Sequence, residues 1–188
     1  AATFNPLVLT VITASEQTAG YGRLGRSWLS PANENLYATF CLSLPLTCKD
    51  YSLLTFVMAL AAAELLKENG LSAHIKWPND LMINEKKIAG ILCESKVIND
   101  ERFLALGIGL NVNITAETLK ALQRPATSMS VETNQRFDLN LLLELLTHHF
   151  LSHLEIFLTK GFVPFVIAIR CYMQIGQFIR FSHGNHLF

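Results

Sequence analysis

The sequence has no excess of charge of either sign, because its 188 residues contain 15 Lys and Arg against 15 Asp and Glu. Balanced charge removes the basic surface that non-specific nucleic-acid binding requires, and there is no acidic tail. The chain also lacks an uninterrupted apolar run of the roughly 18–20 residues that cross a bilayer, although its mean hydropathy is positive. We therefore expect no nucleic-acid partner and no membrane span.

Cysteine is scarce, and no Cys-x-x-Cys pair occurs. Cys41, Cys48, Cys93 and Cys171 lie far apart, so the sequence does not support a zinc site. Cys41 and Cys93 fall inside apolar strand-like runs, where a free cysteine behaves as a small hydrophobic side chain. The first residues place no cationic region before an apolar segment, so no signal peptide is expected. These features predict a reducing, cytoplasmic setting.

Short apolar and β-branched runs predict a sheet. The expected strands are residues 7–14, 36–44, 73–77, 81–83, 87–97 and 103–112, the first of them buried. Turns at Asn84-Glu85 and Asn99-Asp100 are so short that they permit only antiparallel pairing. Together with helices, these strands predict an α+β fold with a mixed, largely antiparallel sheet, and they argue against a doubly wound nucleotide fold.

Helical periodicity predicts two long helices and a short one at 115–123. The first long helix is capped by Asp50 or Ser52 and ends near Asn69, and the last runs from Asp138 or Asn140 to about Lys160. Each long helix is expected to bury one stripe: Leu54, Val57, Met58, Ala61 and Leu65 in the first, and Leu143, Leu146, Phe150, Leu154 and Phe157 in the last.

Two histidines, His149 and His153, lie one turn apart in the last helix. This spacing suits a shared metal ion, but the Glu of the zinc-protease pattern is missing. Two histidines at the flank of a helix are the favoured interpretation.

Residues 16–31 alternate glycine with arginine after an apolar strand. Glycine lets the backbone approach a ligand closely, and arginine presents a planar set of donors to carboxylate or phosphate. The stretch predicts a clamp for an anion, with a mobile turn and solvated arginines as the alternative. Its residues of interest are Gly20, Gly22, Arg23, Gly25, Arg26 and Trp28.

Polar residues follow one expected strand and begin another. After Pro78 come Asn79 and Asp80, which form either a simple turn or a site where Asp80 binds a metal or polar ligand and Asn79 orients it. Lys87 precedes the small pair Ala89-Gly90. Glycine inside a strand often marks the close approach of a ligand, whereas a solvated hairpin end is the plainer interpretation of the lysine.

The stretch 106–113 contains Gly107 and Gly109 but lacks the third glycine and the helix of a dinucleotide fingerprint. Two glycines in a strand make a flat floor on which a purine could lie, with the Asn111 amide able to pair with its edge.

Taken together, the four stretches resemble the biotin protein ligase family. The matching segments are residues 17–28, 76–81, 87–92 and 107–113, in the order and at the approximate spacing of the family. The resemblance implies a catalytic domain similar to class II aminoacyl-tRNA synthetases and biotin synthetases over residues 1–174. Residues 175–188 would begin a small C-terminal SH3-like barrel.

The chain departs from the family pattern at three points. Tyr21 stands where the family loop often has a basic residue. The upstream Ser-Thr-Asn segment that lines the biotin pocket is absent, and the barrel stops soon after it begins. We therefore expect a chain cut at both ends, and no repressor role can be read from it.

The resemblance implies two half-reactions. The carboxylate of biotin attacks the α-phosphorus of ATP, with Mg²⁺, to give biotinyl-adenylate. A lysine of the biotin carboxyl carrier domain of acetyl-CoA carboxylase, or of another biotin-dependent carboxylase, then takes the biotinyl group. Alternatives are a lipoate or octanoate ligase or transferase, and a fragment that only binds biotin. A homodimer remains open.

The resemblance also assigns residues, by position in the matched segments. Lys87 and Arg23 would be catalytic, and Asp80 is the candidate for a metal ligand. Biotin contacts would come from Gln17, Gly20, Tyr21, Arg23, Lys87 and Gly90. Contacts to ATP or the adenylate would come from Arg23, Arg26, Trp28, Asn79, Asp80 and Asn111.

Overall fold

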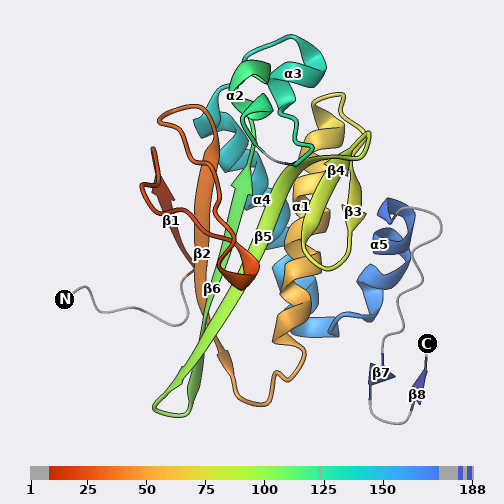
Figure 1. Ribbon diagram of the computed structural model, residues 1–188. Coiled ribbons are helices and arrows are strands. Elements are labelled where there is room, and N and C mark those ends of the chain that lie inside the picture. Colours follow the sequence, from red (N-terminus) through yellow and green to blue (C-terminus); the bar gives the residue numbers. More distant parts are fainter. Residues whose placement is uncertain (1–8, 123, 174–181, 184–185, 188) are drawn as a thin grey trace.

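A six-stranded antiparallel sheet organises the molecule (Figure 1). The computed structural model describes residues 9–122, 124–173, 182–183 and 186–187. The strand order is β1-β2-β6-β5-β4-β3. The α+β prediction is confirmed, and the expected mixed character is wrong for this sheet. Its strands are β1 (Thr10–Ala14), β2 (Leu36–Pro45), β3 (His74–Lys76), β4 (Asp80–Ile83), β5 (Lys86–Ile98) and β6 (Glu101–Leu110).

Two tight turns set the pairing of the central strands. Asn84 and Glu85 join β4 to β5, and Asn99 and Asp100 join β5 to β6, all four at positive φ. Paired positive φ angles suit the twist of a two-residue hairpin, and Asn and Asp tolerate them best among non-glycine residues. The predicted turns are therefore confirmed, and antiparallel registers follow from them.

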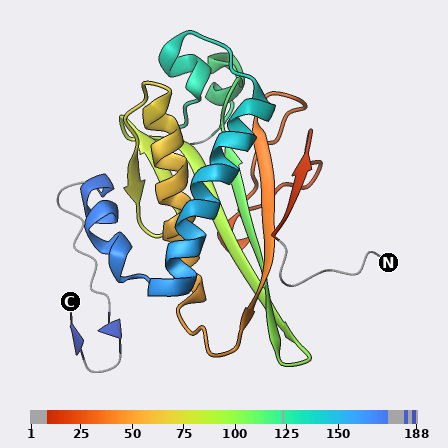
Figure 2. The ribbon, with the colours of Figure 1, turned by 180° about the vertical axis from the view of Figure 1, so that it is seen from behind.

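Two long helices, α1 (Leu54–Glu68) and α4 (Leu139–Lys160), cover one face of the sheet (Figure 2). Phe150 of α4 packs edge-on against Phe40 of β2, with ring centroids 5.1 Å apart. By length and composition α4 could span a membrane, but its packing on α1 and β2 accounts for its apolar face. The shorter helices are α2 (Ala116–Lys120), α3 (Met129–Thr133) and α5 (Val166–Tyr172).

The helix predictions need three corrections. Most of α1 is buried rather than one stripe, because it lies between the sheet, α4 and α5. Its start has no side-chain cap, since the 3₁₀ turn Tyr51–Leu53 leads into it. The buried stripe of α4 begins at Leu142 rather than Leu143. Asp138 does cap α4, accepting hydrogen bonds from the next backbone amides.

The first strand is shorter and more exposed than expected. β1 pairs with β2 at the edge of the sheet, and its Ile12 is 58% exposed. The burial predicted from its apolar composition is therefore wrong, because an edge strand has a neighbouring strand on one side only.

The C-terminal part adds a short antiparallel pair, β7 (Ser182–His183) with β8 (His186–Leu187). The predicted boundary at residues 174 and 175 lies outside the described residues. The proposed start of a second domain therefore stays a prediction.

Candidate active site

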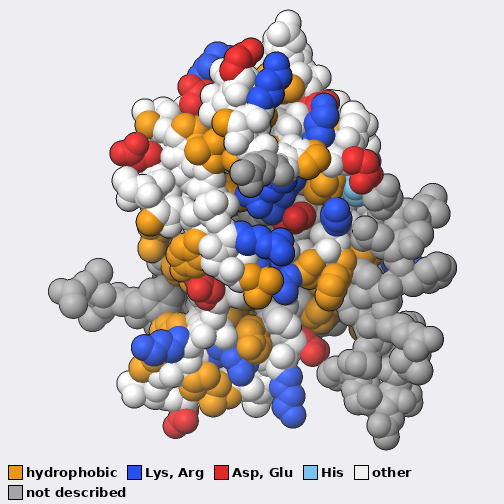
Figure 3. Space-filling view, in the orientation of Figure 1, with side chains coloured by type: hydrophobic (Ala, Val, Ile, Leu, Met, Phe, Trp, Pro, Cys, Tyr) orange, Lys and Arg blue, Asp and Glu red, His pale blue; other side chains and the backbone are white. Residues whose placement is uncertain are grey.

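The face of the sheet opposite the helices holds a cavity of about 550 Å³. In Figure 3, cationic side chains gather around an acidic one in the middle of this face. All six strands of the sheet line the cavity together with the loop after β1 and residues 124–125. The predicted residues that line it are Gln17, Tyr21, Arg23, Arg26, Trp28, Asn79, Asp80, Lys87 and Gly90.

The glycine-arginine stretch forms an ordered flap, residues 20–28, that crosses the cavity. The Gly22 amide donates to the Arg26 carbonyl oxygen at 2.7 Å, and the Trp28 amide donates to the Gly20 carbonyl oxygen at 2.8 Å. A 3₁₀ turn, Arg23–Gly25, closes the tip, with Gly25 at a φ of 68°. The stretch thus forms a hydrogen-bonded hairpin with both arginines at the cavity, as a clamp for an anion requires.

Lys87 and Asp80 form an ion pair at one end of the cavity. Lys87 Nζ lies 2.6 Å from Asp80 Oδ1, and the side chains are 16% and 28% exposed. The pairing of β4 with β5, which sets Asp80 opposite Gly90, brings the two together. Burial lowers the pKa of Lys87, and Asp80 opposes that shift by stabilising the ammonium.

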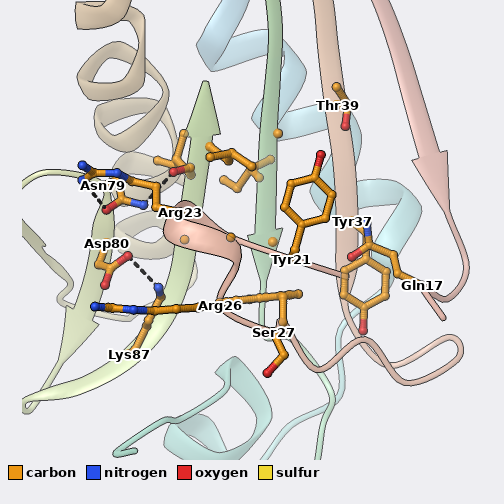
Figure 4. Close-up of a pocket in the computed structure, with 18 of the residues that line it drawn as sticks. Gln17, Tyr21, Arg23, Arg26, Ser27, Tyr37, Thr39, Asn79, Asp80 and Lys87 are labelled. Atoms are coloured by element: carbon orange, nitrogen blue, oxygen red, sulfur yellow. Dashed lines mark hydrogen bonds and ion pairs between the residues drawn. The ribbon is translucent and has the colours of Figure 1, made fainter. Parts of the chain in front are cut away.

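Arg23 reaches the same end from the tip of the flap. Its Nη1 donates to Asn79 Oδ1 at 3.5 Å, and Asn79 Nδ2 donates to the Ile91 carbonyl oxygen at 2.8 Å. Figure 4 shows Arg26 pointing to this end as well. We call Arg23, Arg26, Asp80 and Lys87 the charged end. It can neutralise an anion.

Uncharged polar side chains gather at the other end. Figure 4 places Gln17, Tyr21, Tyr37 and Thr39 away from the charged end, and we call them the neutral end. Gln17 Oε1 accepts a hydrogen bond from Ser30 Oγ at 2.8 Å. Burial is the main cause that raises the pKa of Tyr37 to about 12, so its hydroxyl stays protonated.

The sequence argument missed Tyr37 and Thr39, which line the cavity. Their alternation along β2 was the available signal, because residues two apart share a face of a strand. It also missed Glu94, whose Oε2 accepts a hydrogen bond from Tyr21 Oη at 3.2 Å. That contact joins the flap to β5.

The ring of Trp28 lies on the strand glycines. A Cβ atom at Gly109 would stand 2.6 Å from this ring, so only glycine leaves room for it. Lys87 Nζ lies 5.2 Å from the ring centroid. The indole therefore packs on β6 at Gly109, and a purine lying on these glycines stays a prediction.

Two predicted residues do not line the large cavity. Gly20 packs against Ser30 and Trp28, where a Cβ would meet oxygen atoms at 2.7 Å. Asn111 is 5% exposed and donates from Nδ2 to the Thr127 carbonyl oxygen at 2.9 Å. It lines a small neighbouring hollow with Trp28. Asn111 therefore lies beside the Trp28 ring but outside the large cavity, and its contact with the adenylate stays a prediction.

Candidate metal ligands lie at two places, the histidines of α4 and Asp80. No group of three or more His, Cys, Asp or Glu side chains suited to a metal ion occurs among the residues that the structure describes. His153 Nε2 lies 2.7 Å from Glu64 Oε2, and His149 Nε2 lies 3.1 Å from Glu68 Oε2. The histidines thus join α4 to α1, in agreement with the helix-flank interpretation. Asp80 is the carboxylate of the charged end, and Glu85 and Glu94 also line the cavity.

The antiparallel sheet thus carries, on its face opposite the helices, one cavity with a charged end and a neutral polar end. Residues 5–113 match the model of the Biotin/lipoate A/B protein ligase family. The chain belongs to this family.

Individual relatives agree with this assignment. The bifunctional ligase/repressor BirA of Bacillus subtilis is 31% identical over 183 residues, which cover 95% of this chain and 56% of the relative. The biotin–[acetyl-CoA-carboxylase] ligase of Paracoccus denitrificans is 34% identical, over 81% of this chain and 66% of the relative. The chain thus spans about half to two thirds of these relatives.

A solved structure supports the same conclusion. The biotin protein ligase from Aquifex aeolicus in complex with biotin and ATP superposes with a TM-score of 0.74 at 32% identity. The match covers 91% of this chain and 71% of that one. The α+β arrangement is therefore that of biotin protein ligase catalytic domains.

Proposed function

We propose that this chain is the catalytic domain of a biotin–[biotin carboxyl carrier protein] ligase. A biotin carboxylate oxygen attacks the α-phosphorus of ATP, and pyrophosphate leaves. The amine of an acceptor lysine then attacks the acyl carbon of biotinyl-5′-AMP, and AMP leaves as the amine loses a proton. The observation that carries the proposal is one cavity with a charged end at Lys87 and a neutral end at Gln17.

The charged end suits the first half-reaction. A carboxylate and a triphosphate repel each other, so fixed cations must offset their charge as they meet. Lys87 comes from the sheet, whereas Arg23 and Arg26 come from the flap. Lys87 would contact the reacting carboxylate and phosphate, and both arginines would close over the adenylate. The flap would also keep water from the mixed anhydride.

The neutral end suits the uncharged part of the acid. Gln17 has its amide Nε2 to donate to the ureido group of biotin, and Tyr37 Oη, which donates to the Pro31 carbonyl oxygen at 3.0 Å, can still accept a hydrogen bond. Unpaired buried polar groups cost on the order of 1–3 kcal/mol each, so this end would select against an acid without such a group.

Mg²⁺ belongs to the proposal as a companion of ATP. It is usually held by one or two carboxylates together with substrate phosphates, and the Asp80 carboxylate beside Lys87 fits that pattern. Mg²⁺ would neutralise phosphate charge.

Several finer assignments complete the proposal. The domain would share the class II synthetase-like architecture, residues 175–188 would begin an SH3-like barrel, and the protein would work in the cytoplasm on a carrier domain. A lipoate or octanoate ligase or transferase is the second candidate, because the matched family includes lipoate ligases. A fragment that only holds biotin is the third.

Pyrophosphate release separates these candidates. We expect release on mixing the protein with MgATP and biotin, little release with lipoate or octanoate, and biotinylation of an added carrier domain. Faster release with lipoate would establish the second candidate. Biotin binding by calorimetry without any pyrophosphate would establish the third.

A further inference from the structure

Arg124 is a cation at the cavity that comes from outside the four sequence motifs. Backbone pairing places it there, since the Lys87 amide donates to the Pro125 carbonyl oxygen at 3.1 Å and the Thr127 amide donates to the Lys87 carbonyl oxygen at 2.9 Å. Arg124 Nη2 then donates to the carbonyl oxygen of Ser27 at 3.1 Å. Arg124 lines both the large cavity and the small hollow beside it.

Its neighbours make this corner strongly positive. Arg124 Cζ lies 5.9 Å from the centroid of the Trp28 ring. Lys87 Nζ lies near the same ring. Arg124 and Arg26 both act to lower the pKa of Lys87, as expected where three cations share a small space.

Three carboxylates line the same cavity, and each has a partner other than Arg124. Asp80 pairs with Lys87, Glu94 accepts a hydrogen bond from Tyr21, and Glu85 lies 3.9 Å from His74 Nε2. Among the ion pairs of the described residues, none involves Arg124. A guanidinium whose contacts are a carbonyl oxygen and a ring keeps donors for an anion.

We propose that Arg124 binds a phosphate group of the nucleotide. The inference rests on the proposed ATP-dependent ligation. A guanidinium pairs with phosphate through two parallel hydrogen bonds, and Arg124 stands beside Lys87 at the charged end, where the phosphates must lie. Its bond to Ser27 holds the guanidinium next to the flap.

Calorimetry with ATP and with adenosine tests this role. Because a hydrogen bond to a charged group contributes about 1.5–3 kcal/mol, Arg124→Gln should weaken ATP binding about tenfold or more. Adenosine has no phosphate, so its affinity should change less than about twofold. Arg124→Lys keeps the charge but loses the planar pair of donors, so its loss of ATP affinity should be smaller than that of Arg124→Gln.

Lys120→Gln is the matched control, because Lys120 is an exposed cation on α2 that does not line the cavity. A cooperative thermal unfolding transition checks that each variant is folded. Three results would each overturn the phosphate contact alone. They are an unchanged ATP affinity in Arg124→Gln, equal losses for ATP and adenosine, and a loss in Arg124→Lys as large as in Arg124→Gln. A wild-type protein that binds no ATP would overturn the proposed function and this inference with it.

Discussion

At the scale of single residues, two neighbouring lysines of β5 differ in their expected role, because one faces the cavity and the other faces solvent. Lys87 lies in the cavity next to Asp80, whereas Lys86 is exposed and points to the other face of the strand. One charge aligned with a transition state contributes a few kcal/mol, so Lys87→Ala should reduce biotin-dependent pyrophosphate release about a hundredfold or more. Lys86→Ala should be nearly silent. Equal losses in both variants would mean that the wrong lysine has been assigned.

The ion pair also predicts a pH dependence. Lys87 acts in its charged form, so the rate should fall as the pH rises through its pKa, which burial holds below the usual lysine value of 10.5. Asp80 raises that pKa, so Asp80→Asn should move the alkaline fall to lower pH. The measurement is the initial rate of pyrophosphate release against pH for both proteins. An alkaline fall at the same pH in both would show that another group titrates.

At the scale of elements, the flap and β6 fit together through one missing side chain. A Cβ at Gly109 would stand 2.6 Å from the Trp28 ring, whereas a Cβ at Gly107 would meet its nearest neighbour at 3.6 Å, an ordinary contact. Gly109→Ala should therefore lift the indole off the sheet, and Gly107→Ala should leave it in place. In a Trp77→Phe background Trp28 is the remaining tryptophan. Its fluorescence should shift to longer wavelength in Gly109→Ala, and an unchanged spectrum would place the ring elsewhere.

The elements also show which predictions local chemistry supports. The Asn-Glu and Asn-Asp turns and the Asp138 cap were predicted correctly, since each depends on residues within one turn. The exposure of β1 and the all-round burial of α1 were not, because both depend on what packs beside the element. Composition alone does not distinguish an edge strand from a central one.

At the scale of the whole molecule, Phe150 joins the helical layer to the sheet. It is fully buried and packs on Phe40. Replacing a buried Phe with Ala typically costs about 3–5 kcal/mol, so Phe150→Ala should lower the free energy of unfolding in urea by about that amount. Leu151→Ala, at the exposed next position, should change it by less than about 1 kcal/mol. Similar losses from the two variants would contradict the observed packing of α4.

The family and most of the candidate site could be inferred from the sequence by itself, because four short motifs carry the chemistry within runs of six to twelve residues. Their meeting in one cavity, the pairing of Lys87 with Asp80 and the seating of Trp28 on Gly109 were decided by the tertiary structure. Arg124 shows the reason most clearly. It donates a hydrogen bond to Ser27, which is 97 residues away in the sequence. The strand register and the path of the chain bring the two together, and no local sequence pattern predicts either.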